Sequence, residues 1–150
     1  LLSSADRELL AAEDAGWGEL HALIDSLTVD EAERPGYYRE GWSAKDALAH
    51  IGSWLAVAGA LLQQIREGTY RAEEINIDEL NGRFYETLKD VPLDSIRAQA
   101  ETARARMLQA WSQLPELTPD AVSWIRKAGA EHYWQHLPRL REWIAEVRSR

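Results

Sequence analysis

The segment between Ser43 and Gly68 constrains the fold of this chain more than any other. Six apolar side chains recur there at steps of three and four residues, which places them on one stripe of a helix: Leu48, Ile51, Leu55, Ala58, Leu62 and Ile65. Ser43 can cap the start of this helix, Asp46 follows at its third position near the free amide groups, and Gly68 is a typical stop. The pattern predicts a long amphipathic helix.

Two other segments show the same helical spacing of apolar residues. The first runs from about Ser4 to Leu27, and Ser3 with Asp6 resembles a capping box at its start. The second begins near Pro92-Leu93 and ends near Leu114-Pro115. We expect both to be helices that turn an apolar face inward.

The last helix is expected over roughly the final 25–30 residues of the chain. Thr118 followed by Pro119 is a typical helix start, and we expect the Gly129 region to interrupt the beginning of this helix. Residues 28–41 are expected to form a loop. No segment alternates with period two for long enough to indicate a strand.

About 25 residues separate the second and third long helices, which is long for a connection within a helix bundle. Asn76 with Glu79 predicts a short helix from about Ile77 to Lys89. Such a connection can run back along a long helix, so the two helices it joins can be parallel. The sequence therefore predicts one all-α domain over residues 1–150, a four-helix bundle with a short extra helix in this crossover.

Charge and composition narrow the classes of function. The chain has 25 acidic and 17 basic residues, a net charge of −8, whereas a nucleic-acid-binding protein normally has a basic face. The basic residues cluster only near the C-terminus, where cations favour the helix dipole. The chain has no cysteine, which excludes disulfides, thiolate metal ligands and a catalytic thiol within it. We expect no nucleic-acid partner.

From the sequence, we expect no apolar run to approach the roughly 20 residues that span a bilayer. The first residues, Leu1-Leu2-Ser3-Ser4, lack the basic segment and apolar stretch of a signal peptide. We therefore expect a cytoplasmic protein without a membrane partner.

The expected last helix contains His132 and His136, four residues apart and thus one turn apart on the same face. This spacing lets two imidazoles bind one metal ion. The apolar residues Leu140, Trp143 and Val147 continue their stripe, which indicates that the two histidines face inward. His50 lies at the edge of the inner face of the second helix, one residue before Ile51.

Two interpretations of these histidines remain open. A histidine beside an apolar stripe is more often a hydrogen-bonded core or boundary residue than a ligand. Three protein ligands that leave an open coordination position are instead typical of a catalytic metal site, and neutral imidazoles suit Zn, Ni, Fe or Cu. Spacing alone does not bring His50 to the level of the pair. The fourth histidine, His21, is expected to be a boundary residue.

Residues 41–51 (GWSAKDALAHI) resemble the second-helix signature of the DinB-like superfamily, which includes bacillithiol transferases and mycothiol-dependent maleylpyruvate isomerases. Residues 131–143 (EHYWQHLPRLREW) most resemble its ClbS/DfsB branch. The resemblance extends over nearly the whole chain, including the insert with Asn76 and Asn81. It implies an up-down-down-up four-helix bundle and a three-histidine site for zinc or nickel, formed by His50, His132 and His136.

Three hypotheses for function follow. The first is a divalent-metal-dependent enzyme that acts on a small electrophile as a thiol transferase, isomerase or hydrolase; because the chain lacks cysteine, a thiol would come from a low-molecular-weight cosubstrate. Trp42, Trp54 and Tyr133 are its candidate cleft residues. The second is a protein that sequesters a small molecule without catalysis, suggested by seven Trp and five Tyr. The third is a helical oligomerisation domain with incidental histidines. An apolar face of the bundle also makes a homodimer a reasonable expectation.

Overall fold

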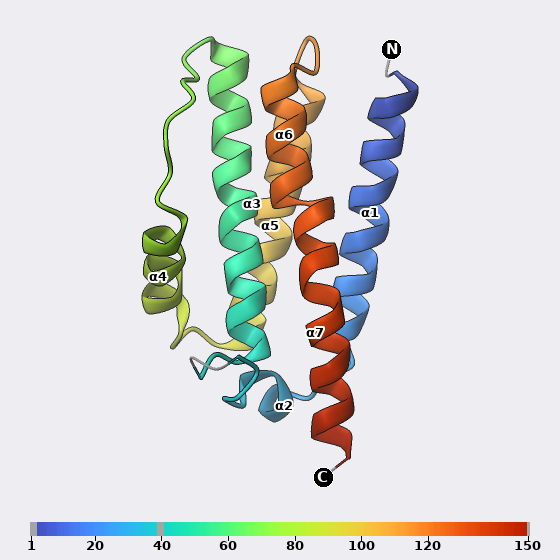
Figure 1. The fold of residues 1–150 in the computed structure, drawn as a ribbon, viewed down its shortest axis with the longest axis vertical. Helices are drawn as coiled ribbons and strands as arrows, with labels where there is room; N and C mark the ends of the chain where they lie inside the picture. Colours follow the sequence, from blue (N-terminus) through green and yellow to red (C-terminus); the bar gives the residue numbers. More distant parts are fainter. Residues whose placement is uncertain (1–2, 39–40, 150) are drawn as a thin grey trace.

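The computed structural model describes residues 3–38 and 41–149, and within these ranges it contains α-helices and no strand (Figure 1). The expected all-α class is confirmed. The helices are α1 (Ser4–Asp25), α2 (Val29–Glu33), α3 (Ala44–Glu67), α4 (Ile77–Leu88), α5 (Leu93–Ser112), α6 (Pro119–Ala128) and α7 (Ala130–Arg148).

The helices α1, α3 and α5 run along the long axis of the molecule, and so do α6 and α7, which follow one another end to end (Figure 1). α3 and α5 run in the same direction, antiparallel to α1 and to α6–α7. The most extensive contacts are those of α3 with α5 and of α1 with α7. α4 lies beside α3, within the connection that returns along the bundle.

A reciprocal side-chain cap sets the start of α3, the helix that carries His50. The Ser43 hydroxyl accepts a hydrogen bond from the Asp46 amide at 3.1 Å, and the Asp46 carboxylate accepts one from the Ser43 amide at 2.9 Å. This reciprocal pair is the capping box expected for α3. At the other end of α3, Gly68 adopts a left-handed conformation with φ of 78°, which favours glycine.

The apolar stripe of α3 faces the core as expected. Leu48, Ile51, Leu55, Ala58 and Leu62 are all buried, with at most 4% of their surface exposed. On the side that faces α5, the backbones approach closely, because a Cβ atom on Gly52 would lie only 3.0 Å from Ala100 Cα. The stripe that predicted the helix therefore fixes which side of α3 faces its neighbours.

The structure differs from the sequence prediction in the expected loop over residues 28–41, of which residues 39 and 40 lie outside the described part of the chain. A five-residue helix, α2, starts at a capping box formed by Thr28 and Glu31. Five residues are too few to show an apolar period, although the capping-box pattern was present. Elsewhere the ends shift slightly: α1 ends at Asp25 and α5 ends at Ser112.

Gly129 interrupts the last helical segment of the chain, as expected, and separates α6 from α7. Its backbone angles, φ −103° and ψ −106°, are not helical. A Cβ atom at this position would lie 2.7 Å from the Ile125 carbonyl oxygen, a distance shorter than Cβ atoms show in real proteins. The break therefore requires glycine, and it places the start of α7 halfway along the bundle (Figure 1).

α3 corrects one expectation about apolar runs. It is long and apolar enough, by length and mean hydropathy, to meet the criteria for a membrane span. The stripe and the small residues that pack on α5 account for this composition, because a core helix meets the same criteria.

Candidate metal centre

His50 of α3 and His132 and His136 of α7 meet in the interior of the bundle. The Nε2 atom of His132 lies 2.9 Å from Nε2 of His50 and 3.2 Å from Nε2 of His136. One ligand nitrogen from each of the three residues lies within 4.8 Å of the other two. The structure thus brings together the three residues singled out from the sequence, including His50, whose level in the bundle the spacing alone did not determine.

The arrangement of these nitrogens suits a metal ion better than it suits hydrogen bonding among the rings. A neutral ring nitrogen offers either one proton or one lone pair, so His132 Nε2 can make a good hydrogen bond with only one of its two neighbours. Three nitrogens bound to one tetrahedral ion at ~2.0–2.1 Å lie about 3.3 Å apart. The spacings from His132 Nε2 to the other two Nε2 atoms, 2.9 and 3.2 Å, are near this value.

The outer nitrogens of two rings also lack ordinary partners. His50 Nδ1 and His132 Nδ1 are buried and make no hydrogen bond of normal geometry with the described part of the chain; His50 has only a weaker contact with the Asn81 side chain, and His132 with the Ala128 backbone. Buried polar atoms normally have a partner. Two incompletely satisfied rings at one buried point are unusual for purely structural histidines, so the donor set fits a divalent ion with imidazole ligands.

Burial keeps the three rings neutral. It lowers the pKa of His50 to about 4, that of His132 to about 3 and that of His136 to about 4, and His136 lowers the pKa of the other two further by charge repulsion. Near pH 7 the rings are therefore unprotonated. This is the state in which imidazole binds metal ions.

Tyr38 contacts the third histidine from the connection before α3. Its hydroxyl lies 3.0 Å from His136 Nδ1. Histidine ligands commonly direct their second ring nitrogen to an oxygen atom in this way, which fixes the orientation of the ring. The connection is itself attached to α7, because Arg139 Nε donates to the Tyr37 carbonyl oxygen at 2.7 Å. Tyr38 was not predicted as a site residue from the sequence, since nothing local relates it to a residue 98 positions later.

A cavity of about 540 Å³ adjoins the three histidines, a size typical of sites for small molecules. α3, α4, α6, α7 and the connection before α4 form its walls. Trp54 and Trp124 contribute aromatic surface, and their indole groups donate to Asn81 Oδ1 at 2.8 Å and to the Tyr70 hydroxyl at 3.2 Å. These two bonds hold α4 and the connection against the bundle.

The three candidate cleft residues have different positions. Trp54 lines the cavity. The Trp42 ring lies 6.0 Å from the His50 ring and stacks on Tyr85 at 5.1 Å, but it is not part of the cavity lining. Tyr133 is fully buried against α1 and donates to Glu13, because one residue along a helix turns a side chain by about 100° away from its neighbour. Trp124 and Tyr70 were not singled out from the sequence.

His21 lies apart from this centre. Its Nε2 atom is 3.0 Å from the Glu101 carboxylate, and its Nδ1 atom is 3.0 Å from that of Asp25. Both nitrogens thus face carboxylates on the surface, as befits the boundary residue expected from the sequence.

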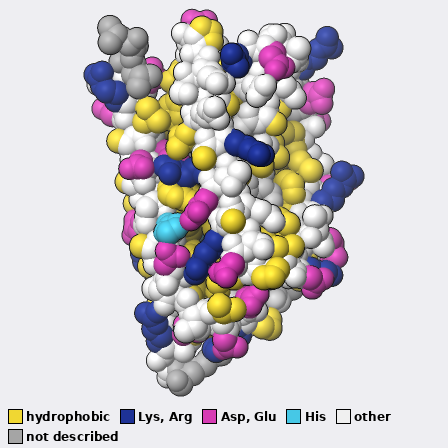
Figure 2. Space-filling view, turned by 180° about the vertical axis from the view of Figure 1, so that it is seen from behind, with side chains coloured by type: hydrophobic (Ala, Val, Ile, Leu, Met, Phe, Trp, Pro, Cys, Tyr) yellow, Lys and Arg dark blue, Asp and Glu magenta, His cyan; other side chains and the backbone are white. Residues whose placement is uncertain are grey.

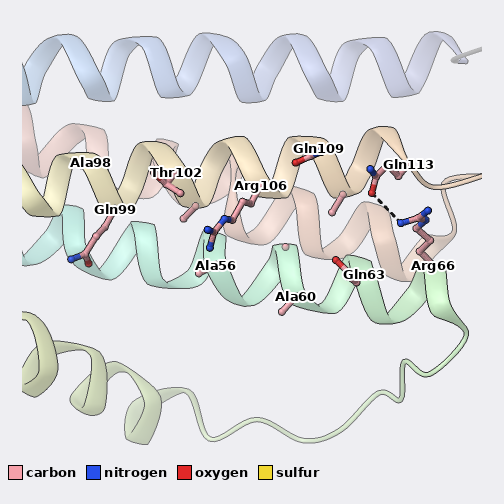
Figure 3. A pocket seen from close by; sticks show the side chains of 13 residues that line it. Ala56, Ala60, Gln63, Arg66, Ala98, Gln99, Thr102, Arg106, Gln109 and Gln113 are labelled. Carbon is pink, nitrogen blue, oxygen red and sulfur yellow. Dashed lines mark hydrogen bonds between the residues drawn. The ribbon is translucent and has the colours of Figure 1, made fainter.

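A larger groove of about 750 Å³ lies between α3 and α5 (Figure 3). Its lining is mainly alanine, glycine and glutamine, with two arginines, one of which, Arg66, donates to Gln113 at 3.2 Å. It contains no histidine and no carboxylate. The groove follows from the small residues that let the two helices pack closely, and it offers no counterpart to the three-histidine centre.

The surface seen from behind carries interspersed acidic and basic side chains (Figure 2). Ion pairs also connect helices on the exterior of the protein, such as Arg141 of α7 with Glu19 of α1. This mixed surface does not single out a site, whereas the three histidines on α3 and α7 form a distinct cluster in the interior.

Comparison with known proteins shows the fold alone. No protein-family model and no curated protein matches the chain. It is similar to the crystal structure of an uncharacterised protein from Escherichia coli UTI89, with a TM-score of 0.79 over 95% of this chain and 94% of that one. The two sequences are 15% identical, so the similarity extends to the helical architecture and not to a function.

Proposed function

We propose that this protein is a metal-dependent enzyme that acts on a small electrophilic molecule, with zinc or nickel held by His50, His132 and His136. One observation carries the proposal: three neutral imidazoles turn their Nε2 atoms to a common point beside a cavity of small-molecule size. Three protein ligands without a fourth are typical of catalytic rather than structural metal sites.

In this proposal, different residues of the chain bind the ion and the small molecule. The histidines hold the ion because their lowered pKa values leave the ring lone pairs free near neutral pH. Trp54 and Trp124 offer apolar surface to the body of the bound molecule. When bound, a divalent ion supplies Lewis acidity, which lowers the pKa of a water molecule or thiol in its open position.

The type of reaction depends on the nucleophile. Because the chain has no cysteine, a thiol transferase or a thiol-dependent isomerase would need a low-molecular-weight thiol in the cavity, whereas a hydrolase would need only water. Following the consumption of a panel of epoxide and unsaturated carbonyl electrophiles, with and without added thiol, separates these possibilities.

We further propose that the chain is an up-down-down-up four-helix bundle of the DinB-like superfamily, nearest the ClbS/DfsB branch. The parallel course of α3 and α5, with α4 in the connection between them, supports this assignment (Figure 1). The similarity to one solved helical protein bears on the architecture only.

Metal analysis of the purified protein tests the proposal. We expect about one divalent ion per chain after loading, and little in the double variant His132→Ala/His136→Ala. His21→Ala is the matched control, because it removes an imidazole that binds carboxylates on the surface. Fewer than ~0.2 ions per wild-type chain after reloading would rule out a three-ligand site.

The cavity also supports a second candidate, a protein that sequesters a small molecule without converting it. Trp54 and Trp124 line the cavity from α3 and α6, so a ligand there would change tryptophan fluorescence. Under this hypothesis the fluorescence change persists in His50→Ala and His132→Ala, and the ligand is recovered unaltered. Loss of binding in both variants favours the metal-dependent function instead.

A further inference from the structure

A buried ionic cluster lies where α7 contacts α1 and α5. Glu13 of α1 has 0% of its surface exposed. Its carboxylate accepts hydrogen bonds from Arg104 of α5, at 2.9 Å from Nε and 2.6 Å from Nη2, and from the Tyr133 hydroxyl of α7 at 2.8 Å. Three helices are thus joined through one carboxylate, and the residue that links α7 to it directly follows His132.

Two glycines make room for this cluster. A Cβ atom on Gly16 would lie 3.0 Å from Cδ2 of Tyr133, so the tyrosine ring packs directly on the α1 backbone. A Cβ atom on Gly129 would lie 3.2 Å from Cγ of Glu13, so the carboxylate side chain packs against the break between α6 and α7. The Tyr133 side chain therefore packs tightly against α1 from the start of α7.

The first turn of α7 has few other constraints. No side chain caps its N-terminus at Gly129. His132 Nδ1 makes no hydrogen bond of normal geometry with the described residues, and the ring has only a weaker contact with the Ala128 backbone, whereas His136 Nδ1 faces the Tyr38 hydroxyl. The direction of the His132 ring therefore depends on the backbone at the start of α7, and the Tyr133 side chain ties this turn to α1 through a hydrogen bond.

Stability alone does not readily explain such a cluster. The desolvation of a buried ion pair often cancels its attraction, so apolar side chains of similar size frequently serve a core as well or better. Hydrogen bonds, unlike apolar contacts, are directional. They can therefore fix both the rotation of a helix about its axis and its position along that axis. In this protein the helix so fixed carries two of the three histidines.

We propose that Tyr133, Glu13 and Arg104 are positioning residues for the metal centre. By holding the first turn of α7 on α1, they keep His132 Nε2 between the ring nitrogens of His50 and His136. This inference rests on the proposed metal-dependent function. The cluster of Glu13, Arg104 and Tyr133 lies outside the cavity. The inference gives this cluster a role in the metal affinity and the geometry of the three-histidine site.

Tyr133→Phe tests the inference, because it removes one hydroxyl and leaves the Glu13–Arg104 pair in place. The matched control is Trp143→Phe on the same helix, which removes a single bond of 3.0 Å from the indole to the Glu31 carbonyl oxygen. Since the control also removes more buried volume, it should lose at least as much stability in urea. Zinc affinity is measured by competition with a chelator, and the visible spectrum of bound Co²⁺ reports the geometry of the site.

We expect Tyr133→Phe to weaken zinc binding about tenfold, as loss of an orienting partner typically does, and to shift the Co²⁺ spectrum. Trp143→Phe should bind both ions as the wild type does. Equal zinc affinity and identical Co²⁺ spectra for Tyr133→Phe and wild type would overturn the inference while leaving the metal function intact. A wild type that binds neither ion would overturn the proposed function, and the inference with it.

Discussion

The Tyr38 hydroxyl lies 3.0 Å from His136 Nδ1, so the connection before α3 contacts the helix that carries two of the three histidines. When His136 offers its Nε2 lone pair to an ion, its Nδ1 carries the ring proton and can donate to this oxygen. The contact therefore selects the ring form that a ligand needs.

Tyr38→Phe should weaken zinc binding by roughly tenfold, because it removes the oxygen that orients His136. A competition titration with a chelator measures the affinity. Tyr85→Phe is the control, since it keeps the aromatic stack of that ring on Trp42. Equal affinities in Tyr38→Phe and wild type would show that the contact has no part in metal binding.

Lowered pKa values predict that the metal-free protein loses stability in acid. A histidine with a pKa of about 6.5 when unfolded and about 3 to 4 when folded binds more protons in the unfolded state. Its contribution is therefore fully present above pH 6.5 and declines as the pH falls toward 4.

Between pH 7.5 and pH 5, the free energy of unfolding in urea should fall by roughly 1–2 kcal/mol for each of the three histidines. His132→Ala/His136→Ala should show a weaker dependence over this interval, because two of the three titrating groups are absent. The same pH dependence in the double variant and the wild type would contradict the assignment of the effect to these rings.

The sequence predicted the parts of the fold that depend on local chemistry. Ser43, Asp46 and Gly68 determine the ends of α3 through contacts with residues three to five positions away, and such signals are readable along the chain. Gly129 likewise indicated the break between α6 and α7. The five-residue α2 was missed because it is shorter than two turns of an apolar period.

The candidate site was predictable only in part. His132 and His136 stand out because their spacing is local, whereas their relation to His50 and Tyr38 depends on how separate helices pack. Tyr133 was expected in the cleft, but a step of one residue from His132 along the helix turns it toward Glu13. Trp124 and Tyr70 meet across 54 residues, and no local pattern indicates that they do.

α4 should exchange its amide hydrogens faster than α3. None of its described side chains is buried, and a helix with little burial opens at low free energy. Trp54→Phe should increase exchange in α4 further, because it removes the indole that donates to Asn81 at 2.8 Å. Hydrogen exchange followed by mass spectrometry measures both effects. Trp143→Phe, far along α7, should leave exchange in α4 unchanged, and protection of α4 equal to that of α3 would contradict the prediction.

Arg104→Met should destabilise the protein strongly, by about 3–5 kcal/mol, because it leaves the Glu13 carboxylate buried without its cationic partner. Arg126→Met is the control, since its pair with Glu131 is half exposed and should contribute less than ~1 kcal/mol. Urea unfolding at neutral pH measures both losses. Losses of similar size would show that Glu13 is solvated more fully than the structure indicates.

The most direct test of the central claim is X-ray absorption at the zinc edge of the zinc-loaded protein. The account predicts imidazole scattering from three ring nitrogens at ~2.0–2.1 Å, with one oxygen ligand completing the shell. In His132→Ala/His136→Ala this imidazole signal should be lost. A wild-type shell made of oxygen ligands alone, or an imidazole signal that survives in the double variant, would contradict a site formed by His50, His132 and His136.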